Sequence, residues 1–356
     1  MDLKNKTLED WLKEPTKESF FNGRIKDYYS PYKTFKDKLL AKHKQVTAGA
    51  RLKNPQLLLN DHGPDHIETV IDRATLLIKD SKCELNAKEV YFLLVAIQIH
   101  DLGNMLGRYE HEQNPLLVVN ELIRLVGEDT IEQKMIKSIA ESHGGKIKNT
   151  GDKDKITKLK PVTDTLGVEI RMQLLASLLR FADELADDKT RCDRDLLEKL
   201  LLPKGSEVFH AYAYCLDSVL IKHSNKQIEL KFKISQNFAL KKFGKWNDEK
   251  SKSVEVYLLD EIYNRVLKMH FERIYTMRFM RNFIDIESIL VLIEFYVNDN
   301  DEKAENFAPI SFEIKEIGYP TSSQSIFQLC PSLTAQGNKI DGKFVSKGGM
   351  KVVKSY

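Results

Sequence analysis

The core of this 356-residue chain is organised around Ala96–Gly103, which reads AIQIHDLG and joins an apolar helix directly to a His-Asp pair. A neighbouring imidazole and carboxylate at the end of a buried helix cost free energy unless another group pairs with them. A divalent metal ion is the simplest partner for His100 and Asp101. Such an ion takes about four to six N or O ligands, so we expect further His and Asp side chains from other segments.

The helix that carries this pair is expected to run from Asn86 to about His100. Asn86 can cap the first turn, and Glu89, three residues on, can return the contact in a capping box. Residues 90–99 are apolar on almost every side of the helix, which predicts a central, buried position. The C-terminal end of the helix is therefore held rigidly, and this suits a pair of metal ligands.

Three further predicted helices direct His or Asp towards the same interior. A helix that starts at residue 64 has His66 on its apolar face. A helix from 129 to 142 leads into His143, and a helix from 167 to about 185 places Asp183 on its apolar face. Each of these residues lies four positions from an apolar residue of the buried face, and residues at this spacing share one side of a helix.

Composition limits the class of protein. The chain is 42% hydrophobic, with 55 basic and 52 acidic side chains, which is typical of a globular protein with one large domain and an accessory one. The net charge of +3 is too small to argue for nucleic acid or a membrane. Four scattered cysteines favour a reduced intracellular setting. Without an apolar leader or a run of eighteen apolar residues, we expect a cytoplasmic location and no membrane span.

We expect four parts along the chain: a helical arm, a helical core, a smaller α+β module and a partly ordered basic tail. Their ranges are 1–59, 60–200, 205–320 and 321–356. The core is expected to include a further helix at 115–126. The module should contain a β-hairpin, a helix and two strands, at 208–235, 254–281, 286–297 and 310–317. The charged stretch 146–160 is expected to be a solvated loop, with a lid or phosphate-steering role as the alternative.

In this order, His66, His100-Asp101 and Asp183 resemble the H…HD…D signature of the HD superfamily of metal-dependent phosphohydrolases. HDLGN at 100–104 and LLRFADELAD at 178–187 support the resemblance. The chain looks most like the HD-CE subgroup, which carries a C-terminal extension and is associated with Hsp90-like ATPases and bacterial conflict systems. The resemblance implies a mainly α fold, an HD-type helical bundle with a smaller C-terminal α+β module.

The resemblance also implies a metal site with His66, His100, Asp101 and Asp183 as ligands. Asp101 would bridge a second ion, with His143 as a ligand on that side. Because soft thiolates are absent from this pattern, the expected cofactor is one or two divalent ions of Mn, Fe, Mg, Ni or Co. For the HD pair alone, the alternative is a helix-capping His–Asp hydrogen bond. For His143, the alternative is an imidazole that caps a helix C-terminus.

Three more residues are candidates for catalysis. DHGPDHIETV at 61–70 resembles the HNxxHxxDV segment of cyclic-nucleotide phosphodiesterases, whose first His protonates the leaving group, and this makes His62 a candidate general acid. His111 and Arg108 resemble the His and Arg that some nucleotide-cleaving members place near the substrate phosphate. The alternatives are a surface-loop histidine for His62 and an ordinary exposed ion pair between Arg108 and Glu110.

The expected function is that of a metal-dependent phosphohydrolase or phosphodiesterase that uses a metal-bound hydroxide on a phosphoester of a nucleotide or oligonucleotide. One alternative is a nucleotide-sensing regulatory protein without turnover, which signals through the C-terminal module to a chaperone-like ATPase or a defence-system component. Another is a di-iron oxygenase, which would need further ligating histidines. The sequence permits a protein partner at the C-terminal module and an oligomer, and it does not indicate the substrate base.

Overall fold

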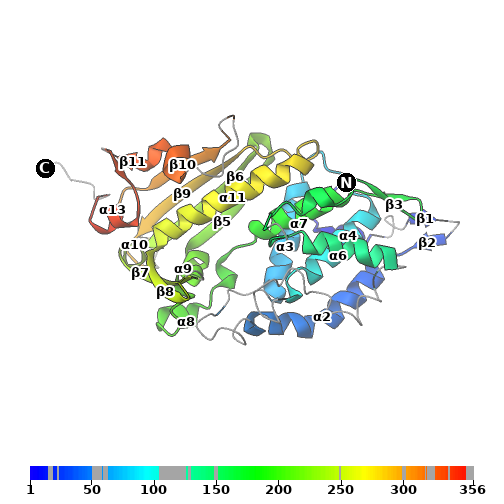
Figure 1. The fold of residues 1–356 in the computed structure, drawn as a ribbon, viewed down its shortest axis with the longest axis horizontal. Coiled ribbons are helices and arrows are strands. Elements are labelled where there is room, and N and C mark those ends of the chain that lie inside the picture. The colour runs from blue at the N-terminus through cyan, green and yellow to red at the C-terminus, as the bar shows by residue number, and fades with distance from the viewer. Residues whose placement is uncertain are drawn as a thin grey trace. The chain divides into compact units, whose positions relative to one another are not determined.

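The computed structural model describes residues 1–14, 19–21, 24–49, 58, 63–103, 126, 130–147, 151–247, 250–298, 302–316, 318, 325–335 and 337–349 (Figure 1). The chain divides into two compact units. Unit 1 contains Met1–Asn54, His62–Ala186 and Tyr275–Asp285. Unit 2 contains Pro55–Asp61, Asp187–Ile274 and Ile286–Tyr356. The helix expected at 115–126 lies, apart from Val126, outside the described residues.

Unit 1 is a group of helices around α4. Its helices are α1 (Leu8–Leu12), α2 (Tyr29–Gly49), α3 (Pro64–Ile78), α4 (Ala87–Ile99), α6 (Thr130–Glu141) and α7 (Met172–Glu184), with a 3-10 turn at Ile156–Lys158. Two short hairpins pair β1 (Ser19–Phe21) with β2 (Arg24–Lys26) and β3 (Thr163–Thr165) with β4 (Val168–Ile170). Residues 88–99 of α4 are all buried, and α4 contacts α1, α2, α3, α6 and α7.

The predicted start of α4 is confirmed, because Asn86 is the N-cap residue and forms the capping box with Glu89. The predicted start of the last core helix is wrong. That helix begins at Met172, and the residues before it form the β3–β4 hairpin. Leu166 and Gly167 form the two-residue turn with φ of 53° and 77°, a backbone conformation that suits a tight hairpin and excludes a right-handed helix.

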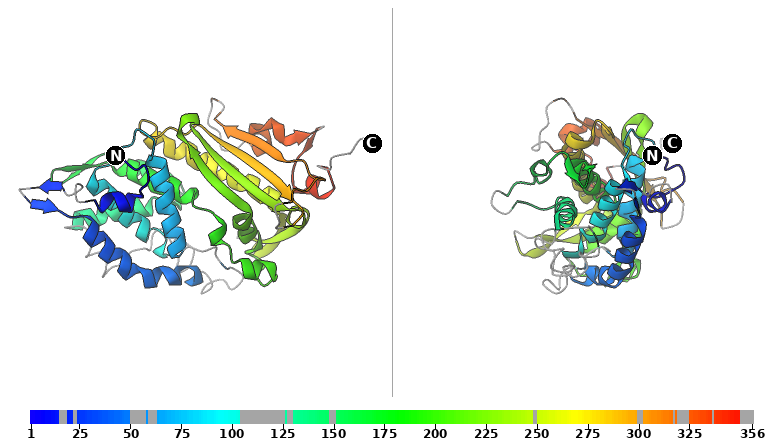
Figure 2. Two further views of the ribbon diagram at one scale, coloured as in Figure 1. Left: turned by 180° about the vertical axis from the view of Figure 1, so that it is seen from behind. Right: turned by 90° about the vertical axis from the view of Figure 1, so that its right-hand side faces the viewer.

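Unit 2 is built on a four-stranded sheet in the order β10-β9-β6-β5. Its strands are β5 (Leu216–Lys222), β6 (Gln227–Ser235), β9 (Ser288–Tyr296) and β10 (Ile310–Lys315). β6 and β9 are parallel, and the other two pairs are antiparallel. Figures 1 and 2 show α11 (Leu258–Met280), of which residues to Ile274 belong to this unit, along one face of the sheet. Alternate residues of a strand share one face of the sheet. In β6 these are apolar residues, such as Ile228, Leu230 and Phe232, and they are buried.

Shorter elements complete unit 2. Its other helices are α8 (Arg194–Glu198), α9 (Glu207–Cys215), α10 (Gln236–Leu240), α12 (Ile326–Leu329) and α13 (Gly342–Ser346). Two small hairpins pair β7 (Lys242–Asn247) with β8 (Lys252–Tyr257) and β11 (Thr334–Ala335) with β12 (Asn338–Lys339). The stretch expected to be a partly ordered tail thus includes short elements that bury Leu333 and Val345.

Several predicted elements of this module differ from the structure. The strands expected at 286–297 and 310–317 are confirmed as β9 and β10. The first hairpin strand was expected from 208, but residues 207–215 form α9, because Val208, Ala211 and Tyr212 bury one helical face. The helix expected from 254 begins at Leu258, since the preceding residues pair with β7.

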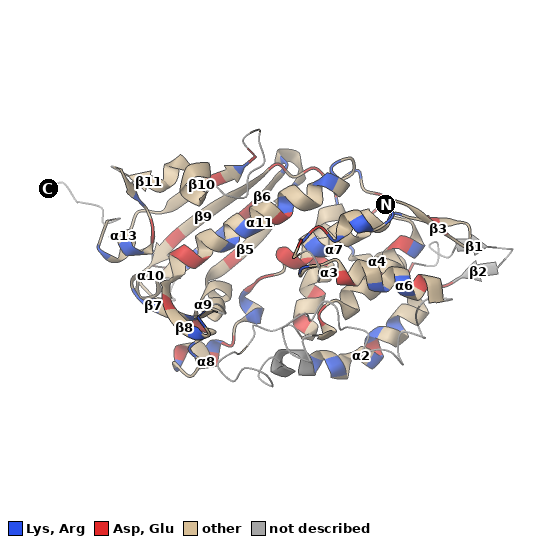
Figure 3. Cartoon of the chain, viewed as in Figure 1, with Lys and Arg blue, Asp and Glu red and all other residues tan. Residues whose placement is uncertain are grey.

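The chain is mainly helical with a β-containing module, as predicted. Basic and acidic side chains are interspersed along α2 and α11 (Figure 3), in keeping with the small net charge of +3. Among the described helices, none is both long and apolar enough to cross a membrane.

Candidate metal centre

Four side chains from three helices of unit 1 converge on one point. His66 comes from the first turn of α3, His100 and Asp101 follow the last turn of α4, and Asp183 comes from the last turn of α7. One donor atom from each residue lies within 4.8 Å of the donor atoms of the other three. His66 and His100 have no exposed surface. The sequence prediction that these four residues lie together is therefore confirmed.

The distances within this cluster fit a single ion. The Nε2 atom of His66 lies 3.2 Å from Asp183 Oδ1 and 3.6 Å from Asp101 Oδ2. The Nε2 atom of His100 lies 3.5 Å from each of the same two oxygens. Two ligand atoms about 2.1 Å from one ion are about 3.0 Å apart in adjacent octahedral positions and about 4.2 Å apart in opposite ones. All four distances fall within that range.

The orientation of His100 is fixed by the end of its own helix. Its Nδ1 atom lies 2.8 Å from the carbonyl oxygen of Ile97. This contact favours the tautomer that carries the proton on Nδ1, so that the lone pair of Nε2 faces Asp101 and Asp183. The buried Nε2 atom has no hydrogen-bond partner among the described residues. A backbone carbonyl on one ring nitrogen and a vacant lone pair on the other is the usual arrangement of a metal-binding histidine.

His143 approaches Asp101 from the other side. Its Nδ1 atom lies 2.6 Å from the carbonyl oxygen of Ala140, and its Nε2 atom lies 3.7 Å from Asp101 Oδ1. Asp101 therefore directs Oδ2 at His66 and His100 and Oδ1 at His143. The contact with Ala140 is the one expected of an imidazole that caps a helix. The approach to Asp101 is the one expected of a ligand for a second ion. The rings of His143 and His100 lie almost perpendicular to each other, with centroids 4.9 Å apart.

The two carboxylates of the cluster require a nearby positive charge. Burial alone would lower the pKa of His100, but the carboxylates of Asp101 and Asp183 outweigh it and raise this pKa to about 9. Burial would raise the pKa of Asp183, but its contacts with His100 and His66 hold that pKa well below the ordinary value. Either a proton on the imidazole or a divalent cation can supply the charge that the two carboxylates require.

Three candidate residues for catalysis lie outside the described part of the chain. They are His62, Arg108 and His111. Their roles stay predictions, and the geometry of the described residues neither adds to them nor removes them.

The sequence did not predict the support that α2 gives to the candidate metal centre. His43, to which no role was assigned, places Nε2 2.7 Å from the carbonyl oxygen of Gln98. The side chain of Gln98 donates to the hydroxyl of Tyr32, also on α2, at 3.0 Å. These two contacts hold α4 two residues before His100. A lone histidine in a charged helix gives no sequence signal for such a contact, because Gln98 is 55 residues away.

Residues 55–267 match the family model named HD-CE. The chain belongs to the HD-CE family. The match covers more than half of the 356 residues and confirms the resemblance seen in the sequence. It includes every residue of the metal centre and runs on through much of unit 2. No match was found among the curated proteins or among the solved structures.

Proposed function

We propose that this HD-CE protein is a metal-dependent phosphohydrolase or phosphodiesterase that acts on a phosphoester of a nucleotide or nucleic acid. The observation that carries the proposal is the convergence of His66, His100, Asp101 and Asp183 within 4.8 Å. Two imidazoles and two carboxylates form a donor set for Mn, Fe, Mg, Ni or Co. Membership of the HD-CE family supports the same proposal, as does the helical core, which we assign to the HD-type bundle.

Each residue of the candidate metal centre has a part in this proposal. His66, His100, Asp101 and Asp183 hold the ion, and Ile97 fixes the ring of His100 through the contact at 2.8 Å. When bound, a divalent ion would polarise the phosphoryl oxygens and lower the pKa of a water molecule from about 15.7 towards 7. His66, His100 and Asp101 are buried, which strengthens electrostatic interactions at the site, whereas the Asp183 side chain is 27% exposed and leaves a side open to solvent.

The remaining roles rest on motif resemblance. We assign to His62 or His111 the transfer of a proton to the departing oxygen, and to Arg108 a contact with the phosphate. His143 faces the second oxygen of Asp101 at 3.7 Å, and this supports a role as a ligand of a second ion. A two-ion centre would hold both the attacking and the leaving oxygen.

A second candidate function is nucleotide sensing without turnover. The HD-CE match does not stop at the helical core but continues to residue 267, so much of unit 2 is part of the family pattern. An extension of this kind suits a module that reports ligand binding to a protein partner. In that case the metal centre would orient a bound phosphate, and no product would form.

Metal analysis followed by a hydrolysis panel tests both candidates. The purified protein is analysed for metal by mass spectrometry and assayed on nucleotides and oligonucleotides with Mn, Mg, Ni, Co or Fe. We expect turnover to fall at least about 1000-fold in Asp101→Ala, because a catalytic ion contributes several kcal/mol. Asp37→Ala, which removes an exposed carboxylate of α2, is the matched control and should keep full activity.

Other outcomes would decide against the hydrolase. Turnover that survives in Asp101→Ala would show that the cluster is not the reaction centre. Stoichiometric nucleotide binding without product would favour the sensor. Iron-dependent consumption of dioxygen would identify an oxygenase.

A further inference from the structure

The first two helices of unit 1 are joined to two helices of the metal centre by one network of polar side chains. Both α1 and α2 contact α3 and α4. At the centre of the network lies Glu9 of α1, whose carboxylate accepts hydrogen bonds from two side chains of α2. The donors are the hydroxyl of Tyr32 and the ammonium of Lys36, the latter at 2.7 Å. From these two donors the network extends to α4 and to α3.

The first branch ends on α4, two residues before His100. The side-chain amide of Gln98 donates to the hydroxyl oxygen of Tyr32 at 3.0 Å. Both residues are buried, with 1% of each exposed. The other polar atom of this amide, Oε1, is buried and has no hydrogen-bond partner among the described residues. Within that part of the chain, the Tyr32 hydroxyl is therefore the only hydrogen-bond partner of the Gln98 side chain.

The second branch ends on α3, two residues after His66. The ammonium of Lys36 lies 2.7 Å from a carboxylate oxygen of Glu68 and 2.7 Å from one of Glu9, so it bridges two acidic side chains. Burial would lower the pKa of Lys36, but hydrogen bonds to the two carboxylates outweigh it and raise this pKa. The ammonium therefore stays charged and links α3 to α1.

The two branches reach the metal-binding helices on the side away from the ligands. Two residues along a helix correspond to a turn of about 200°, so Glu68 points nearly opposite to His66. The same holds for Gln98 and His100. The network thus contacts the outer side of α3 and α4 and leaves the inner side to the ligands. Because both branches meet at Glu9, a change in the spacing of the two helices would break at least one of these contacts.

We propose that Glu9, Tyr32 and Lys36 are positioning residues of the metal centre. Ligand atoms must be held to within about 0.5 Å of the binding geometry, and side chains behind the ligands help to hold them. His66 and His100 come from α3 and α4, so a shift between these helices changes nitrogen–oxygen distances that are now 3.2 to 3.6 Å. The inference rests on the metal centre of the proposed function and is independent of the reaction and its substrate.

Titration of the metal-free protein with Co²⁺, followed by visible absorption, tests the inference. Tyr32→Phe removes one hydroxyl from the first branch and keeps the ring. Lys36→Met removes the charge of the second branch. We expect each of these two network variants to bind Co²⁺ at least about threefold more weakly than the wild type, with shifted absorption bands, because the ligand geometry relaxes. Lys36→Arg keeps a charge that can reach both carboxylates and should restore the affinity to within about twofold.

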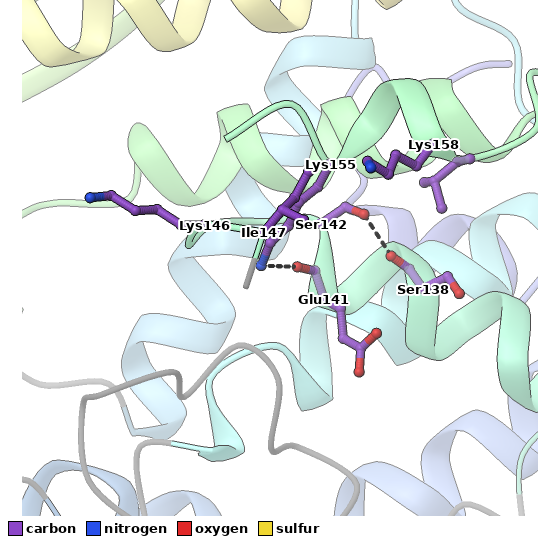
Figure 4. A pocket seen from close by; sticks show the side chains of 8 residues that line it. Ser138, Glu141, Ser142, Lys146, Ile147, Lys155 and Lys158 are labelled. Atoms are coloured by element: carbon purple, nitrogen blue, oxygen red, sulfur yellow. Dashed lines mark hydrogen bonds between the residues drawn. The ribbon is translucent and has the colours of Figure 1, made fainter. Parts of the chain in front are cut away.

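Two control variants remove a local contact of unit 1 that lies outside the network. Asn86→Ala removes the cap at the opposite end of α4. Ser138→Ala removes a hydroxyl of α6, shown in Figure 4, that donates to the carbonyl oxygen of Lys134 at 2.9 Å. In both controls we expect the affinity for Co²⁺ to change by less than about twofold and the absorption bands to stay the same, even where the free energy of unfolding falls.

The outcomes separate this inference from the proposed reaction. Equal affinity and identical spectra in the wild type and both network variants would overturn the inference and leave the metal centre in place. A loss of affinity as large in Asn86→Ala as in Tyr32→Phe would also overturn it, because the effect would then follow stability alone. A wild type that binds no Co²⁺ would overturn the metal centre and the network's role together.

Two further results are covered by the same design. Co²⁺ binding that weakens as expected, without turnover on any substrate, would remove the hydrolase and support the positioning network. Should Tyr32→Phe fail to fold, the comparison of Lys36→Met with Lys36→Arg decides the question, because these changes are made at a side chain that is 29% exposed.

Discussion

The two ends of α4 each carry a buried charged cluster, and the two clusters are closed in different ways. At the N-terminal end, the ammonium of Lys88 lies 2.5 Å from a carboxylate oxygen of Glu132, with side-chain exposures of only 2% and 1%. Lys88 also donates to the carbonyl oxygen of Thr165 at 3.1 Å. The neighbouring Glu89 accepts from the guanidinium of Arg171. Each charge at this end has an opposite charge within hydrogen-bonding distance.

At the C-terminal end the same helix presents two imidazoles to two carboxylates. The four nitrogen–oxygen distances, 3.2 to 3.6 Å, are at or beyond the upper limit of an ordinary hydrogen bond. The groups are close enough to share an ion but too far apart to satisfy each other fully. Burial of charge alone therefore does not mark a functional site. What distinguishes the C-terminal cluster is that it is made of two imidazoles and two carboxylates, with no lysine or arginine in the set.

The largest effect on stability is expected at the N-terminal end of α4, where Lys88 pairs with Glu132. Glu132→Ala leaves Lys88 buried without its counter-charge and should lower the free energy of unfolding by about 3–5 kcal/mol. Urea denaturation measures this change. Replacing both partners, as in Lys88→Met/Glu132→Leu, should restore most of it. Glu169→Ala, which removes an exposed carboxylate, is the control. If Glu132→Ala lowers the stability no more than this control does, the Lys88–Glu132 pair does not stabilise the fold.

The contact between His43 of α2 and the carbonyl oxygen of Gln98 can be tested by measuring stability as a function of pH. Burial lowers the pKa of His43 from its ordinary value of 6.5 to about 4, so the folded protein keeps this imidazole neutral where the unfolded chain protonates it. The contribution of neutral His43 to the free energy of unfolding is fully present above pH 6.5. It is lost as the pH falls towards 4, by roughly 3 kcal/mol at most. His43→Gln retains a donor for Gln98 but cannot titrate, so its stability should fall less over this range. Parallel pH curves for the two proteins would contradict the assignment.

Metal addition should raise the free energy of unfolding through the His/Asp cluster at the C-terminal end of α4. An ion at 100 times its Kd adds about 2.7 kcal/mol to the free energy of unfolding, provided that it binds the folded state alone. Thermal denaturation with manganese and with EDTA should show this shift in the wild type and not in Asp183→Asn. Glu169→Ala should respond as the wild type does. An equal shift in Asp183→Asn would place the bound ion elsewhere.

The smallest effect is expected from the cap of α4. Asn86 accepts a hydrogen bond from the backbone N–H of Glu89 at 2.9 Å, and loss of such a cap costs about 1 kcal/mol. Asn86→Ala should therefore lower the midpoint of urea denaturation slightly. Metal content should not change, because the substitution is at the opposite end from the ligands. A clear loss of metal would show that the two ends do not behave independently.

The sequence predicted those features that depend on near neighbours or on a repeated pattern. The capping box of α4 joins residues three apart, so Asn86 and Glu89 could be recognised without a fold. His66, His100-Asp101 and Asp183 were brought together by helical phase and by resemblance to a known signature. The pattern indicated the face of each helix but no distance. The resemblance implied that His143 lies on the second side of Asp101, and the structure adds the 3.7 Å separation of Nε2 from Oδ1.

Features that depend on distant partners were not predictable. Lys88 looks like an ordinary polar residue near a helix start, and its partner Glu132 lies on another helix. In the stretch 146–160, Ile156 is buried, and its backbone N–H donates to the hydroxyl of Tyr275, 119 residues away. Residues 208–215 were predicted as part of a strand, but tertiary packing buries one helical face of this stretch instead.

The length of α4 has a consequence for how this chain can change over evolution. Lys88 and His100 are 12 residues apart, about 18 Å along the axis, and each added residue would turn one end against the other by about 100°. One insertion would swing His100 away from Asp183 or Lys88 away from Glu132. About seven added residues, close to two turns, are the smallest insertion that restores the phase to within about 20°. Thus a single insertion or deletion between Lys88 and His100 would misalign one of the two clusters.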